Sequence, residues 1–235
     1  FVSIITFSKI QLNDGSHNLM RDSFRHKGLR KQLVEKLSEK GINDEIVLQA
    51  IGKIPRHLFI DNAFDNFAYQ DKAFPIGSGQ TISQPYTVAF QTQLLNIKKY
   101  DKVLEVGTGS GYQAAVLSIL NTDLYTIERQ KKLFLRTKNF LPKLGYNCRF
   151  VYGDGYKGLS KFAPYDKIII TCGAPQIPSD LISQLKIGGK MVAPIGEGEV
   201  QVMHLLEKIS ESETKITTHG EFSFVPMLSN KNDGD

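Results

Sequence analysis

The chain has 235 residues, of which 41% are hydrophobic and 23% are charged, with a net charge of +5 at pH 7. These values are ordinary for a soluble globular protein with one full core, and no apolar run approaches the roughly 18 residues of a membrane helix. Two cysteines, Cys148 and Cys172, are too few for a disulfide framework and lack metal-ligand spacing. We therefore expect reduced, buried thiols in a cytoplasmic protein that has no metal site. The basic balance permits an acidic partner but identifies none.

The first residues show no clean periodicity, and residues 1–12 are apolar but lack the basic lead-in and the cleavage site of a signal peptide. We interpret residues 1–20 as an extension or disordered tail, with Met20 as the natural start.

Two helices are predicted next. Apolar residues recur at roughly helical spacing over residues 21–40, and Gly41 is a plausible C-cap. Asn43 is expected to cap a second helix that ends near Ile51. A loop-rich region follows, and Pro85 is typical of the first turn of a helix over residues 85–95.

Beyond residue 100 the pattern becomes that of alternating strands and helices. Short apolar runs predict strands at residues 102–106, 124–128, 148–152, 166–171 and 189–195. Helical stretches lie between the early runs, at residues 112–120 and 130–145. Such alternation indicates βαβ units and a parallel sheet with helices on both faces. Residues 200–209 and 218–227 are predicted to be further strands that close one edge.

The first of these strands runs into a glycine-rich loop, VLEVGTGSG, and then into a helix. Glycines let the backbone approach a ligand and adopt positive φ, and the following helix offers free N–H groups. A dinucleotide fingerprint requires glycine or alanine where Tyr112 stands, and the chain has no P-loop motif.

Three acidic residues lie at the carboxyl ends of successive strands, where open α/β sheets bind ligands. Glu105 precedes the glycine loop, where a carboxylate would repel a pyrophosphate but attract an ammonium group. Glu128 ends the second strand and can accept both hydroxyls of a ribose. Asp154 follows the third strand and can bond an adenine amino group.

The acid-x-Gly-x-Gly-x-Gly loop resembles motif I of S-adenosylmethionine-dependent methyltransferases. The resemblance implies an α/β, doubly wound, mostly parallel, seven-stranded Rossmann-like fold, here with an N-terminal helical addition. It implies S-adenosyl-L-methionine as the cofactor and S-adenosyl-L-homocysteine as the product.

A second resemblance names the acceptor. The segments AFPIGSGQTISQPYTVA, EVGTGSGYQAA, GDG, APYDKIII, QLKIGGKMVAPIG and FVPM occur in that order. Together they resemble the protein-L-isoaspartate (D-aspartate) O-methyltransferase family over about residues 21–228. The resemblance implies methyl transfer to the α-carboxylate of L-isoaspartyl residues in damaged proteins, followed by succinimide formation and partial return to aspartate. It implies that Ser83 is the catalytic residue and that Gln80 to Ser83 line the cofactor and the acceptor.

In full, the residues expected to contact the cofactor are Gln80, Thr81, Ile82, Ser83, Glu105, Gly107, Thr108, Gly109, Gly111, Glu128, Asp154 and Gly155. Three departures from the family pattern stand out. Leu228 stands where some family members have a polar residue, so no cofactor contact is assigned to it. Thr171-Cys172-Gly173 replaces an expected alanine run and leaves that wall of the site undefined. The N-terminal extension is unmatched.

Several alternatives stay open. Ser83 could instead be the N-cap of the helix over residues 85–95. The boxes of DNA amino- and cytosine-methyltransferases are absent, and Cys172, His57 and His204 are interpreted as structural. The rival functions are a methyltransferase for a small carboxylic acid or RNA, a non-catalytic binding module, and, more remotely, an NAD oxidoreductase.

The domain prediction is one methyltransferase domain over residues 21–228, with a tail at 229–235. Residues 21–100 are expected to form a helical, substrate-side region and residues 101–228 the cofactor-binding sheet. We expect a monomer that binds isoaspartyl proteins and peptides, and neither nucleic acid nor membrane.

Overall fold

The computed structural model of the chain describes residues 22–233. The predicted extension at residues 1–20, with Met20, lies outside this range. Seven strands form one sheet in the order β5-β4-β3-β6-β7-β8-β9, and β1 and β2 pair as a separate antiparallel hairpin. Strands β5, β4, β3, β6 and β7 are parallel, whereas β8 and β9 continue the sheet antiparallel. This is the doubly wound, mostly parallel seven-stranded sheet that the sequence predicted.

The strands are β1 Phe74–Gly77, β2 Gln80–Ile82, β3 Lys102–Val106, β4 Asp123–Glu128, β5 Arg149–Tyr152, β6 Tyr165–Ile170, β7 Leu185–Ile195, β8 Gln201–Lys208 and β9 Thr214–Phe222. The α-helices are α1 Phe24–Glu39, α2 Glu45–Lys53, α3 Pro85–Leu95, α4 Tyr112–Ile119, α5 Lys131–Phe140 and α6 Ser179–Ser183. Short 3-10 helices are η1 Arg56–Phe59, η2 Asn62–Phe67, η3 Leu141–Leu144, η4 Gly155–Lys157 and η5 Ser160–Phe162.

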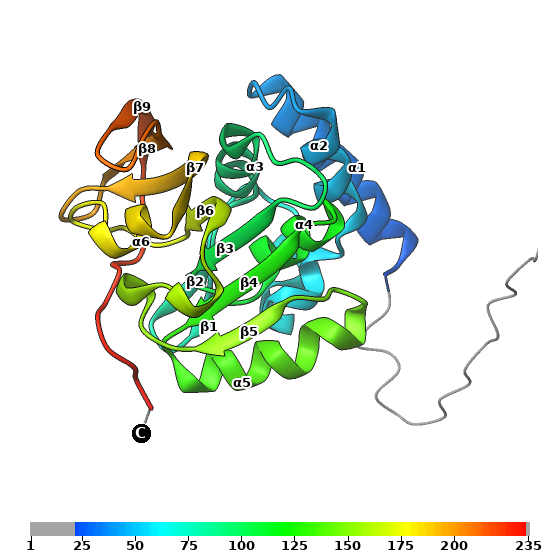
Figure 1. Cartoon of the computed structure of the whole chain (residues 1–235). Helices are drawn as coiled ribbons and strands as arrows, with labels where there is room; N and C mark the ends of the chain where they lie inside the picture. The colour runs from blue at the N-terminus through cyan, green and yellow to red at the C-terminus, as the bar shows by residue number, and fades with distance from the viewer. Residues whose placement is uncertain (1–21, 234–235) are drawn as a thin grey trace, which may run out of the picture.

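Alternation along the strands divides the core between the two faces of the sheet. Val103 of β3 and Ile169 of β6 belong to a cluster that includes buried residues of α1 to α5. Leu104 and Ile168, one residue along, belong to a second cluster under η4, η5 and α6. In Figure 1 the helices α1 and α2 lie together beyond α3, and β8 and β9 lie at the far end of the sheet.

Several element boundaries differ from the sequence prediction. Strand β7 begins at Leu185 and not at residue 189, and strand β9 begins at Thr214 and not at residue 218. The first helix begins at Phe24, because the Ser23 hydroxyl accepts the His26 N–H as N-cap. The second helix is capped by Asp44 and not by Asn43, since the Asp44 carboxylate accepts two N–H groups of its first turn. Strand β9 ends at Phe222, short of the predicted 227.

Residues beyond β9 leave the sheet edge and return to the middle of the molecule. The Gly173 N–H donates to the Val225 carbonyl at 2.9 Å, and the Met227 N–H donates to the Gly173 carbonyl at 2.7 Å. The segment predicted as a tail from residue 229 also makes backbone bonds. The Asn232 N–H donates to the Arg129 carbonyl at 2.8 Å, which holds this segment beside the end of β4.

Candidate active site

The glycine loop between β3 and α4 is built for close backbone packing. Gly107, Gly109 and Gly111 all have positive φ, at +99°, +51° and +84°. A Cβ at Gly107 would lie 2.5 Å from Oγ1 of Thr171, and a Cβ at Gly111 would lie 2.7 Å from Cγ2 of Thr137. No larger side chain fits either position without displacement, so the loop is a cradle that requires glycine.

Glu128 lies at the carboxyl end of β4, on the other side of this cradle. Its Oε2 accepts the Gly109 N–H at 2.9 Å and its Oε1 accepts the Gln130 N–H at 2.8 Å. The side chain is buried, and burial raises the pKa of its carboxyl although these backbone bonds oppose the shift. Each oxygen retains a second lone pair, so Glu128 can still accept hydroxyl groups of a ligand.

A hollow opens above the loop and Glu128, at the carboxyl ends of β3, β4 and β6. Gly155 closes one wall, where a Cβ would lie 2.5 Å from Cγ1 of Val106. Cys172 lines another wall, and burial, supported by the nearby Glu128 charge, raises the pKa of its thiol to about 12. The thiol is therefore protonated at neutral pH, which fits a structural role rather than a nucleophile. We call this space the cofactor hollow. Its lining comprises Gln80, Thr81, Val106, Gly107, Gly109, Ile127, Glu128, Arg129, Gln130, Gly155, Thr171, Cys172, Val225, Pro226, Met227 and Leu228.

Two of the predicted acids do not line this hollow. Glu105 is fully buried beneath the loop, and neither of its carboxylate oxygens has a hydrogen-bond partner among the described residues. Burial raises the pKa of Glu105 to about 8.

Asp154 uses its carboxylate within the chain. Its Oδ1 accepts the Tyr156 N–H at 3.0 Å, and its Oδ2 accepts the Asn230 N–H at 2.8 Å. The next residue, Gly155, is the one that faces the hollow.

The β1–β2 hairpin brings the Gln80 to Ser83 segment over the glycine loop. Its turn needs positive φ at Gly77, Ser78 and Gly79, which explains the two glycines. Gln80 lines the cofactor hollow, whereas Ile82 is buried in the core and lines a narrower space against the loop.

Ser83 lies where two spaces meet. It lines the narrow space, together with Thr108 and Gly109, and also a hollow of about 710 Å³ on the other side of the hairpin. Thr81 and Thr171 line both of these spaces as well as the cofactor hollow, so the three form one continuous cleft. The N-cap of α3 is Gln84, whose own side chain makes no capping bond, so the interpretation of Ser83 as the N-cap is wrong.

The larger hollow, which we call the acceptor hollow, has an aromatic wall. Tyr86 and Phe90 of α3 stack at 5.6 Å between ring centroids, and Phe222 of β9 lies 5.3 Å from Phe90. His219 and Glu221 supply polar groups from β9. The space is large enough for a side chain with its flanking backbone.

The sequence missed part of this cleft. Residues 225–228 line the cofactor hollow, including Leu228, for which no contact was expected. Thr171, left undefined before, fixes the loop because its hydroxyl lies 3.0 Å from the Val106 carbonyl and 2.7 Å from the Gly107 carbonyl. The FVPM motif was a signal for the first group. No local sequence pattern predicted that this segment returns to pair with Gly173.

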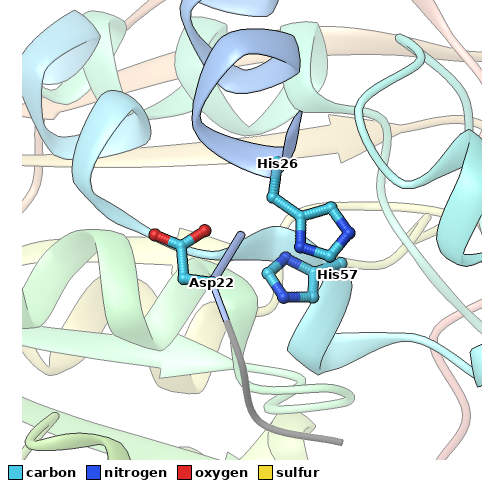
Figure 2. Close-up of side chains that lie close together, drawn as sticks. All are labelled: Asp22, His26 and His57. Carbon is cyan, nitrogen blue, oxygen red and sulfur yellow. The ribbon is translucent and has the colours of Figure 1, made fainter. Parts of the chain in front are cut away.

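Away from the cleft, Figure 2 shows Asp22 near the stacked rings of His26 and His57. One potential ligand atom from each lies within 4.8 Å of the others. The imidazoles stack at 3.8 Å with 29° between their planes, so their in-plane lone pairs do not converge on one ion. Asp22 already accepts two hydrogen bonds from Arg30. His57 Nδ1 lies 2.8 Å from the Tyr69 hydroxyl, and burial lowers its pKa to about 4, which supports the structural interpretation of His57.

Comparisons with known proteins agree with this geometry. A family model described as "Protein-L-isoaspartate(D-aspartate) O-methyltransferase (PCMT)" matches residues 28–232. A protein-L-isoaspartate O-methyltransferase of Christiangramia forsetii is 59% identical over 214 residues, which cover 91% of this chain and 100% of that protein. One from Flavobacterium johnsoniae shows the same identity and coverage.

Solved structures have the same fold. A protein-L-isoaspartate O-methyltransferase superposes with a TM-score of 0.77 at 29% identity, covering 86% of this chain and 66% of that one. A putative Plasmodium falciparum enzyme, crystallised with S-adenosyl-L-homocysteine, has a TM-score of 0.76 at 24% identity and covers 86% of this chain and 99% of that one. Within residues 22–233, no helix is long and apolar enough to cross a membrane.

Proposed function

The chain belongs to the protein-L-isoaspartate(D-aspartate) O-methyltransferase family, and we propose that its cleft esterifies the α-carboxylate of L-isoaspartyl residues in proteins and peptides. The ester then forms a succinimide, whose hydrolysis returns part of the damage to aspartate. The observation that carries the proposal is the continuous cleft, in which Ser83 stands between the glycine cradle and the acceptor hollow.

The residues present fit the cofactor that the family uses. Gly107 and Gly109 of the glycine cradle line the cofactor hollow with backbone atoms alone, and Glu128 offers carboxylate lone pairs beside them. When bound, S-adenosylmethionine supplies a methyl group already activated by a sulfonium. We assign its binding to residues that line the cleft: Gln80, Thr81, Ile82, Ser83, Gly107, Thr108, Gly109, Glu128 and Gly155.

The three remaining residues that were predicted to contact the cofactor do not line the cleft but support residues that do. Gly111 permits the tight packing of the loop on Thr137, and Asp154 holds the turn before Gly155. Glu105 places a mostly protonated carboxyl group beneath the loop, where a cationic ligand would favour its ionisation. We propose these as supporting positions rather than direct contacts.

The reaction needs little from protein acids and bases. A carboxyl group with a pKa near 4 is ionised at pH 7, so the acceptor oxygen needs no general base. The task of the chain is to align that oxygen, which can supply at most about 7–11 kcal/mol. The Ser83 hydroxyl can donate to one carboxylate oxygen and leave the other free to attack.

The test is methyl transfer by Ser83→Ala to an isoaspartyl peptide and to its aspartyl twin. We expect base-labile ester on the isoaspartyl peptide alone. The variant should lose about 10- to 100-fold in rate, the value of one hydrogen bond to a charged group. Its calorimetric affinity for S-adenosylmethionine should be unchanged. Ser212→Ala, in the exposed turn between β8 and β9, is the matched control.

Equal rates in Ser83→Ala and wild type would remove Ser83 from the mechanism. Cofactor binding without ester on any peptide would favour a binding module, and ester on RNA or on a small acid would favour the other rival. A cytoplasmic location, a monomeric state and the absence of nucleic-acid partners stay predictions.

A further inference from the structure

Helix α3 begins at Pro85, two residues after Ser83, so the start of this helix influences where the Ser83 hydroxyl lies. The beginning of α3 lacks the usual local capping. Gln84 occupies the N-cap without a side-chain bond, and Pro85 has no N–H to satisfy. The first N–H of the helix therefore belongs to Tyr86.

A carboxylate from outside the helix satisfies that N–H. Asp71 lies in the loop before β1, and its Oδ1 accepts the Tyr86 N–H at 2.8 Å. The Asp71 side chain is only 12% exposed. A negative group at this position also interacts favourably with the helix dipole.

Lys40, just after α1, completes the arrangement. Its Nζ lies 2.5 Å from Oδ2 of Asp71 and 5.6 Å from the centre of the Tyr86 ring. Lys40 thus compensates the Asp71 charge at the carboxylate oxygen that does not accept the Tyr86 N–H. The Tyr86 ring continues into the aromatic wall of the acceptor hollow, 6.3 Å from the Phe222 ring.

The far end of α3 is anchored independently. Gln93 Oε1 accepts the N–H groups of Asn43 and Asp44 at 2.7 and 2.9 Å. Loss of the Asp71 contact would therefore release the first turn, which carries Tyr86 and begins two residues after Ser83, without freeing the whole helix.

We propose that Asp71 is a positioning residue for methyl transfer, which sets Ser83 and Tyr86 against the acceptor by accepting the Tyr86 N–H. The inference rests on the proposed function of Ser83. Asp71 touches neither the acceptor hollow nor the cofactor hollow, so its effect on catalysis passes through α3.

Steady-state kinetics of the full chain test this proposal. In Asp71→Ala the KM for an isoaspartyl peptide should rise about five- to tenfold, because peptide binding must then order the first turn of α3 at a cost similar to that of a lost N-terminal cap. The KM for S-adenosylmethionine should stay within about twofold, because the cradle is built from other elements. Asp71→Asn keeps an oxygen acceptor for the Tyr86 N–H and should restore the peptide KM to within about twofold of wild type.

Asp61→Ala is the matched control. Asp61 also accepts an N–H, that of Ala63, at the start of η2, but it is remote from α3 in the chain. Its loss should leave both KM values unchanged. A reduced melting temperature in Asp71→Ala without a selective rise in peptide KM would overturn the proposal, as would an Asp71→Asn variant as impaired as Asp71→Ala.

A second readout does not depend on the reaction. Amide hydrogen exchange in the first turn of α3 should be faster in Asp71→Ala and near wild type in Asp71→Asn. If exchange responds in this way while wild type fails to methylate isoaspartyl peptide, the proposed function fails and the role of Asp71 in positioning α3 stands. Unchanged exchange refutes the role of Asp71 itself.

Discussion

Glu105 gives the sharpest test of how the cofactor loop is stabilised. Its carboxyl group is fully buried without a hydrogen-bond partner among the described residues, and its pKa is about 8 against 4.5 for an ordinary glutamate. The folded chain therefore holds a proton that the unfolded chain releases between these two values. The contribution of Glu105 to the free energy of unfolding should be greatest below pH 4.5, fall as pH rises, and level off above pH 8.

The magnitude follows from the two pKa values. Each unit of difference corresponds to about 1.4 kcal/mol, so the full effect approaches about 5 kcal/mol. Between pH 5 and pH 8 the contribution of Glu105 should fall by about 3 to 4 kcal/mol. Glu105→Gln has the same shape and no charge, so its stability should not show this fall.

Urea unfolding at pH 5, 6, 7 and 8 measures the difference directly. The other titrating groups are common to both chains, so they cancel when wild type is subtracted from Glu105→Gln. The gap should widen in favour of the variant as pH rises. Glu213→Gln, at an exposed glutamate, should follow the wild-type curve. Parallel curves for Glu105→Gln and wild type would mean that Glu105 is already ionised in the folded state, and would refute the reasoning.

Two further predictions concern the cofactor. A cationic ligand against the loop should lower the pKa of Glu105. Binding of S-adenosylmethionine at pH 7 should therefore release a fraction of a proton from wild type and none from Glu105→Gln. Calorimetry in buffers of different ionisation enthalpy measures the number of protons released. Gly107→Ala should weaken cofactor binding more than about tenfold, because its Cβ would meet Thr171 at positive φ. Gly145→Ala, with positive φ but open space, should lose stability and keep its affinity. Equal affinities in the two alanine variants would contradict the cradle.

The sequence predicted well where the determinants are local. Alternating apolar runs placed the sheet, and the spacing of Gly107, Gly109 and Gly111 placed the loop because each glycine answers a steric demand of its own turn. The end of the second apolar run likewise placed Glu128 at the carboxyl end of its strand. These features depend on a few adjacent residues.

The sequence did not predict site features that depend on a hydrogen-bond partner from a distant part of the chain. Asp154 stands at the right strand end, but the returning C-terminal segment supplies the Asn230 N–H that occupies one of its oxygens. Asp71 has no local signal at all, since its partner lies 15 residues away in α3. The predicted capping role of Ser83 failed for the same cause, because a distant carboxylate accepts the first N–H of the helix.

The N-terminal helices belong to the active site through buried polar contacts of this distant kind. Arg56 is completely buried, and its guanidinium donates to the carbonyls of Ala68 and Lys72 in the loop before β1. The same group lies 4.7 Å from the centre of the Tyr112 ring, at the first residue of α4 after the glycine loop. A buried cation is costly unless its donors are satisfied. Nε and Nη2 of Arg56 are satisfied by the loop before β1, whereas Nη1 has no hydrogen-bond partner among the described residues. These two bonds and the ring contact hold that loop and the start of α4 against Arg56. We infer that residues 22–100 fold with the sheet as one unit, because the hairpin that leads into Ser83 follows this same loop.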